Sequence, residues 1–438
     1  MNADSYAEAM YPKMKTWRRE LHQFPETGWT EYVTTYRIYE ILKELDFTLF
    51  TGKDAIHSSS RMGVPTQEEL GEAVKRAKEA GADEAFLSKL EGGHTGVVAV
   101  LDTGKAGPHT ALRFDIDALP IHEAEEAVHF PAEKGFSSSR KGAMHACAHD
   151  GHTAIGLATA SFLSRHRQEL KGKFTLLFQP AEEGSRGAKS MVDKGWLDDV
   201  DYFLGGHIGI EDLQIGQIAA TADQFLATTK FDVRFHGKAS HAGKRPEEGK
   251  NALLAAASCV QSLFAISPHS GGATRLNIGT LTAGSGRNIV PDHAIFTGET
   301  RGETNELNEY VFSEAKRIIH SSADLWQVEA ELIEAGHGTA ARCDDIFPEL
   351  VSRAAKQSSF LTEVLPVIAL GASEDVTHMI NRVQEKGGKA TYMIFGTPLK
   401  EGHHHPRFDF NEEVLKTGLL AFLTVLIYMQ TNEKEWSE

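Results

Sequence analysis

The sequence has little of what marks secreted or membrane-bound proteins. It has three cysteines, Cys147, Cys259 and Cys343. This small and odd number argues against a disulfide framework and agrees with a reducing compartment. The most apolar run, Leu415–Met429, is interrupted by Lys416 and two threonines, so it predicts a buried terminal helix rather than a membrane span. The N-terminus is polar and lacks the apolar core of a signal peptide. We therefore expect a cytoplasmic protein with no membrane partner.

Positive charge is also scarce. Lysine and arginine number 45 against 61 aspartates and glutamates, which gives a formal net charge of −16. A chain this acidic is a poor match for phosphate backbones, so we expect no nucleic-acid partner. The 438 residues exceed one ordinary compact domain, and a composition of 41% hydrophobic and 24% charged residues is typical of globular proteins. The length therefore predicts two domains.

What the chain does contain is an alternation of short β-like runs with helical stretches. This pattern predicts an α/β protein with a mainly parallel sheet. The expected strands are Val97–Leu101, Thr110–Phe114, Phe174–Phe178, Tyr202–Leu204 and Tyr392–Phe395, and the expected helices include Thr153–Arg165 and Ala188–Lys194. The polar segment Ser58–Gly92, with a helical stretch at Glu68–Ala80, predicts an insertion on the surface of the larger domain.

The block from about Phe225 to Gly336 has a different order of elements. Its β-α-β-β-α-β order is the split βαβ, or ferredoxin-like, arrangement. The elements are expected at Lys230–His236, Asn251–Ile266, Arg275–Leu281, Ala294–Arg301, Glu306–Ser322 and Gln327–Ile333. Because the α/β pattern resumes afterwards, we interpret the block as an inserted domain. Residues 1–222 and 337–438 would then form the two parts of a catalytic domain around an insertion at 223–336.

Side chains that commonly bind metals follow several predicted strands. Ligands of open parallel sheets bind at the carboxyl ends of the strands, so these segments are expected to meet at one edge. The arrival of several such segments at one edge is stronger evidence for a metal site than any single motif. The residues are Asp115 and Asp117 after one strand, Glu182 and Glu183 after the next, His207 after a third, and His403, His404 and His405 after the last, of which we expect one to be a ligand.

Cys147 and His149 stand just before a predicted helix. Residues two apart point away from each other on a helix, but a turn before it can aim both at one ion. A thiolate and an imidazole suit zinc or another borderline divalent ion. Side chains of neighbouring residues in extended chain point opposite ways, so one of Glu182 and Glu183 can bind metal while the other acts as general base. Two solvated acids are the alternative for that pair.

Three polar residues of the inserted block are further candidates. His241 follows a strand in the run Ser240–Gly243, where a lone histidine is more often structural. Asn288 can donate hydrogen bonds, and Arg301 can form a bidentate pair with a carboxylate. Spacing alone singles out neither Asn288 nor Arg301.

Together these segments resemble a metal-dependent aminoacylase and carboxypeptidase family that includes the hippurate, auxin-conjugate and p-aminobenzoyl-glutamate hydrolases. The segments Ser59–Gly63 and Gly92–Gly96 are similar to the p-aminobenzoyl-glutamate branch of that family. The similar segments extend over nearly the whole chain and are Arg18–Glu26, Arg113–Pro120, Met144–His152, Gln179–Gly184, Ser240–Gly243, Gly286–Pro291 and His404–Pro406.

The resemblance implies a dinuclear metallopeptidase catalytic domain with an inserted dimerisation or lid domain. It implies Glu182 as general base, His241 as oxyanion stabiliser, and Asn288 and Arg301 as holders of the substrate carboxylate. It implies a homodimer, or a heteromer with a homologous subunit. Finally, it implies two divalent ions, Mn²⁺ or Zn²⁺, held by Cys147, His149, Glu183, His207 and His404.

The expected reaction is hydrolysis of the amide of an N-aroyl or N-acyl amino acid, foremost p-aminobenzoyl-glutamate. The alternatives are other N-acyl amino acids or dipeptides as substrates, a low-activity subunit that supports a homologous partner, and a structural zinc module, which the scattered, glutamate-containing ligand set disfavours. One residue departs from the family pattern. Ala148 stands where glycine is usual, and it costs roughly 1 kcal/mol if its φ is positive.

Overall fold

The computed structural model describes residues 1–210 and 212–432, and the backbone forms two compact units. The first unit comprises the described residues of Met1–Asp223, Ala341–Leu370 and His378–Glu438. The second comprises Gln224–Ala340 and Gly371–Thr377. The chain therefore leaves the first unit and returns to it, and the block predicted as an insertion falls almost entirely in the second unit.

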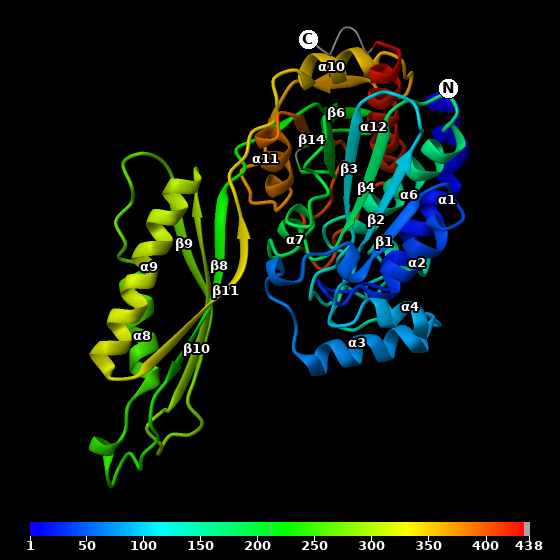
Figure 1. Cartoon of the computed structure of the whole chain (residues 1–438). Helices are drawn as coiled ribbons and strands as arrows, with labels where there is room; N and C mark the ends of the chain where they lie inside the picture. Colours follow the sequence, from blue (N-terminus) through cyan, green and yellow to red (C-terminus); the bar gives the residue numbers. More distant parts are fainter. Residues whose placement is uncertain (211, 433–438) are drawn as a thin grey trace. The chain divides into compact units, whose positions relative to one another are not determined.

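The first unit is built on an eight-stranded sheet in the order β1-β2-β4-β3-β5-β14-β6-β12 (Figure 1). The four strands β4, β3, β5 and β14 pair in parallel at its centre, while β2 and β6 join them antiparallel on either side. The mainly parallel sheet and all five predicted strands are confirmed. The bounds are β1 Thr48–Thr51, β2 Val97–Asp102, β3 His109–Asp115, β4 Lys173–Gln179, β5 Tyr202–Ile208, β6 Gln217–Ala219, β12 Glu363–Leu365 and β14 Lys389–Phe395. A separate pair is formed by β7 (Ala222–Asp223) and β13 (Ile368–Ala369).

Three long helices pack together beside this sheet: α1 (Ala3–Gln23), α6 (His149–Arg165) and α12 (Val414–Thr431). α6 lies very close to the strands because Gly156 has no side chain; a Cβ there would lie 2.7 Å from the ring of Phe114 on β3. α12 is long and apolar enough to cross a membrane by length and composition, yet 83% of it is buried inside the fold. The predicted buried terminal helix is confirmed.

Shorter helices complete the first unit. The predicted surface insertion contains α3, which begins at a capping box formed by Thr66 and Glu69 and buries Leu70, Ala73 and Ala77. These apolar residues form a small cluster of their own with α2 and α4. The bounds are α2 Tyr32–Leu42, α3 Gln67–Glu79, α4 Glu84–Lys89, α5 Phe130–Lys134, α7 Ala188–Val192, α10 Phe347–Ala355 and α11 Thr377–Glu385.

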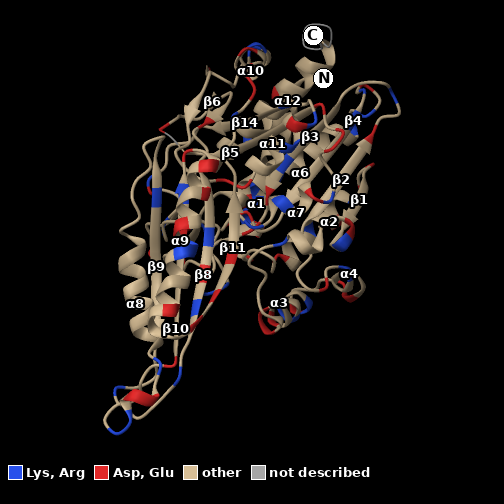
Figure 2. Cartoon of the chain, turned by 60° about the vertical axis from the view of Figure 1, so that its left-hand side comes forward, with Lys and Arg blue, Asp and Glu red and all other residues tan. Residues whose placement is uncertain are grey.

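The second unit is a four-stranded antiparallel sheet in the order β11-β8-β10-β9, covered by two helices. The predicted β-α-β-β-α-β order is confirmed. α9 is amphipathic: its apolar residues join the buried cluster with α8 and the sheet, while its charged residues, which Figure 2 colours along the ribbon, are exposed or half-buried. The bounds are β8 Ala227–His236, α8 Ala252–Leu263, β9 Thr274–Ala283, β10 His293–Gly302, α9 Asn305–Trp326 and β11 Glu329–Gly338.

Candidate metal centre

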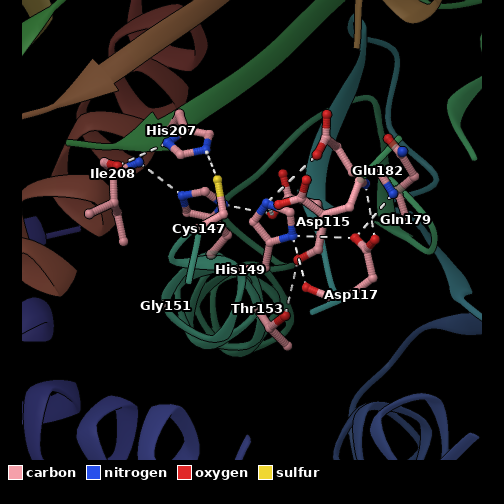
Figure 3. A network of polar contacts seen from close by, with 12 residues as sticks. Asp115, Asp117, Cys147, His149, Gly151, Thr153, Gln179, Glu182, His207 and Ile208 are labelled. Atoms are coloured by element: carbon pink, nitrogen blue, oxygen red, sulfur yellow. Dashed lines mark hydrogen bonds and ion pairs between the residues drawn. The ribbon is translucent and has the colours of Figure 1, made fainter. Parts of the chain in front are cut away.

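Six ligand-type side chains meet at the carboxyl end of the parallel strands of the first unit. The donor atoms of Cys147, His149 and His207 lie within 4.8 Å of one another. The same holds for Cys147, Glu183 and His404, and for His149, Glu182 and Glu183. Because the three groups share members, the six residues surround one site, part of which Figure 3 shows.

A left-handed residue turns the chain into α6. Ala148 has φ 63° and ψ 14°. Its φ is positive, so its methyl group strains the backbone where glycine would not. His149 is the first residue of α6, and its Nδ1 donates to the carbonyl oxygen of Asp117 at 2.9 Å. Its Nε2 is buried and has no hydrogen-bond partner in the described part of the chain. That nitrogen is therefore left for a metal.

His207 presents its own Nε2 to the same site. Its Nδ1 donates to the carbonyl of Ile208 at 2.9 Å, and its Nε2 lies 3.5 Å from the sulfur of Cys147 (Figure 3). Burial, reinforced by the neighbouring His152 and His403, holds the pKa of His207 well below its ordinary value. The imidazole is neutral, which is the form that binds metals.

The loop after β14 brings His404 to the other side of the site. Its backbone N–H donates to the carbonyl of Ala146 at 2.8 Å, which ties this loop to the one that carries Cys147. Its Nε2 lies 3.4 Å from Oε1 of Glu183. Of the two neighbouring histidines, His403 donates to the Ile208 carbonyl and His405 faces Glu401, so neither joins a ligand group within the described residues.

Asp117 fixes the turn that carries the two glutamates. Its Oδ1 accepts the backbone N–H of Glu182 and its Oδ2 accepts that of Glu183, both at 3.0 Å. The expectation of extended chain here is wrong, because Ala181 is left-handed (φ 52°) and the pair lies in a turn. Both carboxylates therefore approach His149, with Glu182 Oε2 3.9 Å from its Nε2.

The charges of the site fit a divalent cation. Burial would lower the pKa of His149, but Asp115 and Asp117 raise it to about 10. Burial and the charge of Asp117 likewise raise the pKa of Glu31 to about 8. The raised pKa of His149 reports the negative charge of the carboxylates around it, whereas that of Glu31 reports first its burial and then the charge of Asp117. The buried Oε1 of Glu183 accepts no hydrogen bond from the described residues, so it is available as a metal ligand. The combination of thiolate, imidazole and carboxylate suits Zn²⁺ or a similar ion.

A buried ionic network supports the start of α6. Nε of Arg18 donates to Oδ2 of Asp150 at 3.0 Å, and the same oxygen lies 2.8 Å from Nδ1 of His22. Nε2 of His22 in turn lies 2.9 Å from Glu123. Asp150 directly follows His149, so the network holds the helix end that presents this ligand. From the sequence, Asp117 was singled out only as a ligand-type residue after a strand, and no role was assigned to Arg18, His22 or Asp150, although these three lie in segments that resemble the family.

The three remaining candidates lie in the second unit. His241 and Asn288 occupy adjacent segments, since His241 forms a β-bridge with Ile289 and the N–H of residue 242 donates to the Asn288 carbonyl. Both side chains are exposed. Arg301 lies on β10, where its guanidinium pairs with the carboxylate of Glu299 at 2.9 Å. The first two are thus brought together, and Arg301 is engaged elsewhere.

Known proteins share this sequence and architecture. The family described as Peptidase family M20/M25/M40 matches residues 111–428. The indole-3-acetyl-aspartic acid hydrolase of Enterobacter agglomerans is 46% identical, and a p-aminobenzoyl-glutamate hydrolase subunit of Escherichia coli (strain K12) is 45% identical. Each alignment covers 94% of this chain and 94% of the relative.

Solved structures agree. An aminobenzoyl-glutamate utilization protein from Klebsiella pneumoniae is 40% identical with a TM-score of 0.84, covering 98% of both chains. A dinuclear metal binding peptidase of the M20 family from Bacillus subtilis is 25% identical with a TM-score of 0.65, covering 97% of this chain and 99% of the other. The overlapping ligand groups and these matches point the same way: the chain belongs to peptidase family M20/M25/M40.

Proposed function

We propose that the protein hydrolyses amides of acidic amino acids, foremost p-aminobenzoyl-glutamate to p-aminobenzoate and glutamate. Its membership of a family of metal-dependent hydrolases makes it an enzyme that acts on amide bonds. The observation that carries the proposal is a single site in which Cys147, His149 and Glu183 each belong to more than one of the overlapping ligand groups. Glu182 lies beside them in the same site. Two relatives named for amides of aspartate and glutamate support the choice of substrate.

The site takes divalent metal ions, and we assign its ligands as two overlapping sets. Cys147, His149, Glu183, His207 and His404 would hold two ions, Mn²⁺ or Zn²⁺. Such ions, when bound, supply a Lewis acid and lower the pKa of water towards neutrality. The thiolate favours zinc, while the carboxylate also suits manganese.

Glu182 is the proposed general base. Its backbone is fixed by Asp117, and its carboxylate lies beside His149 in a largely buried position. In this role it takes a proton from the attacking water and returns it to the amide nitrogen as the bond to the acyl carbon breaks. A carboxylate held in place in this way serves both proton transfers without rearrangement.

Residues of the second unit would complete the reaction. We propose that His241 donates a hydrogen bond to the developing oxyanion and that Asn288 and Arg301 bind the α-carboxylate of the substrate. For Arg301 this requires the guanidinium to exchange Glu299 for the substrate carboxylate. A cytoplasmic homodimer is the proposed form, and a heteromer with a homologous partner chain is the alternative.

The experiment replaces Glu182 by Gln in protein purified alone and loaded with Mn²⁺ or Zn²⁺. We expect kcat for p-aminobenzoyl-glutamate to fall by about 10²- to 10⁴-fold while metal content stays at the wild-type level. Glu72→Gln, at an exposed position on α3, is the matched control. Near-normal turnover of Glu182→Gln removes it from the mechanism.

A panel of other substrates separates the alternatives. It contains indole-3-acetyl-aspartate, hippurate and simple dipeptides beside p-aminobenzoyl-glutamate. A wild-type chain that binds metal but turns over none of them contradicts the proposed enzyme and favours a supporting role beside a homologous partner.

A further inference from the structure

We infer that Arg186 forms a subsite for the side-chain carboxylate of the substrate. This inference rests on the proposed function, because it explains how a site that cleaves amides would select acidic amino acids.

Arg186 belongs to the same turn as the metal ligands. Its Nε donates to the backbone carbonyl of Glu183 at 2.8 Å, and its Nη1 donates to the carbonyl of Gly63 at 3.1 Å. The first bond holds the guanidinium against the turn that presents Glu183. The second ties it to the surface insertion of the first unit. Two backbone acceptors on different segments therefore fix its position without neutralising its charge.

A glycine makes room for this side chain. A Cβ at Gly28 would collide with Nη2 of Arg186 and would approach Ala181, the residue before the two glutamates. The neighbouring Thr27 pairs with Ala118, which directly follows Asp117. The guanidinium thus lies against Gly28, on a segment that pairs with the residue after Asp117.

The charge of Arg186 has no carboxylate partner among the described residues, in a chain whose net charge is −16. Nη2 has no hydrogen-bond acceptor in the same part of the chain, yet it is not among the buried orphaned atoms, so its N–H groups face solvent. Arg18 and Arg19, by contrast, are engaged by aspartates and a glutamate. A fixed guanidinium with free N–H groups is the arrangement that binds carboxylates best.

A second unpaired cation lies on the insertion. Nη1 of Arg61 donates to the carbonyl of Gly92 at 2.6 Å, and its guanidinium stacks over the ring of Trp29. No described carboxylate forms an ion pair with it. Arg61 is two residues from Gly63, whose carbonyl accepts the hydrogen bond from Arg186. The positive charges of Arg61 and Arg186 therefore both favour an anion on this side of the site.

One substrate molecule is long enough to contact both the site around Glu183 and the guanidinium of Arg186. Arg186 follows Glu183 by three residues, so their Cα atoms lie at most about 10 Å apart, and the side chain folds back onto that residue. The distal carboxylate of a glutamate or aspartate amide lies roughly 5 Å from the amide nitrogen. An amide bound beside Glu183 would therefore bring that carboxylate within reach of the guanidinium.

The test is a ratio of specificities. For wild type and Arg186→Gln, kcat/KM is measured with p-aminobenzoyl-glutamate and with p-aminobenzoyl-glutamine, which differ only in the distal charge. We expect the glutamate-to-glutamine ratio to fall by about ten- to a hundredfold, chiefly through KM, because a charge-assisted hydrogen bond is lost. Lys189→Gln, which removes an exposed lysine paired with Asp193, is the control and should leave the ratio unchanged.

Binding is measured separately by calorimetry on metal-loaded Glu182→Gln protein. The Kd of p-aminobenzoyl-glutamate should rise when Arg186→Gln is added, with a smaller change for the glutamine compound. If Arg186 had a merely structural role, the variant would bind both compounds more weakly by the same factor. An unchanged glutamate-to-glutamine ratio of kcat/KM overturns the inference while leaving the proposed function intact. If wild type cleaves neither compound, the proposed function itself fails.

Discussion

Asp117 holds His149 through both its backbone and its side chain: the imidazole Nδ1 lies 2.9 Å from the carbonyl oxygen and 3.3 Å from Oδ1. The same carboxylate accepts the N–H groups of Glu182 and Glu183. One aspartate two residues beyond the end of β3 thus orients a ligand from α6 and the turn that follows β4. Ligand orientation of this kind sets metal affinity as much as the ligands themselves do.

Replacing Asp117 by Ala should lower metal affinity by about 10- to 100-fold, because His149 loses a partner and the glutamate turn loses two acceptors. The affinity for Mn²⁺ and Zn²⁺ is measured by competition with a chromophoric chelator. Asp102→Ala, at the exposed end of β2, is the control. An Asp117→Ala protein that binds both ions as tightly as wild type contradicts this role.

Much of the fold and the ligand set follows from the sequence. The five strands of the first unit are short apolar runs with ligand-type residues just beyond them, and parallel strands deliver such residues to one edge. The six elements of the second unit are likewise visible in the order of their apolar patterns. Cys147, His149, Glu183, His207 and His404 were selected on that basis and on a family resemblance, and the structure brings them together.

The rest depends on long-range contacts and on backbone angles that local patterns do not encode. Asp117 and Asp115 look alike in sequence, yet Asp117 accepts from the glutamate turn while Asp115 pairs with Arg113 and His152. The left-handed Ala181 turned an expected extended pair into a turn. Arg186 could not be identified from the sequence, because its position is fixed by the carbonyl of Gly63, which is far away in the chain.

Ala148→Gly should stabilise the protein by roughly 1 kcal/mol, because glycine adopts the positive φ of this residue without strain. The free energy of unfolding is measured by urea denaturation of the metal-free protein. Ala146→Gly is the matched control: Ala146 is buried two residues away and has no positive φ, so the same change there should destabilise. Equal losses of stability in both variants would show that Ala148 is not strained.

Stability should fall at alkaline pH through His22. Burial opposes its protonation, but hydrogen bonds to Asp150 and Glu123 raise its pKa to about 9 from 6.5. A raised pKa means that the protonated form stabilises the fold. This contribution is complete below about pH 6.5 and is lost as the pH rises through about 9.

The check is the urea midpoint between pH 6 and 10 for wild type and His22→Gln. Wild type should lose stability across this window, whereas His22→Gln should start lower and show a flatter profile. His166→Gln, at the end of α6, should keep the wild-type slope. Parallel profiles for wild type and His22→Gln would rule out the protonated histidine as the cause.

The proposed hydrolysis depends above all on one site that holds two metal ions, and the metal content of the protein tests this most directly. The metal-to-protein ratio is measured by mass spectrometry after equilibration with Mn²⁺ or Zn²⁺ and removal of unbound ions, for wild type, Cys147→Ala and His404→Ala. We predict two ions per wild-type chain and the loss of at least one in each variant. A wild-type chain that retains no ion, or variants that keep both, would contradict the account.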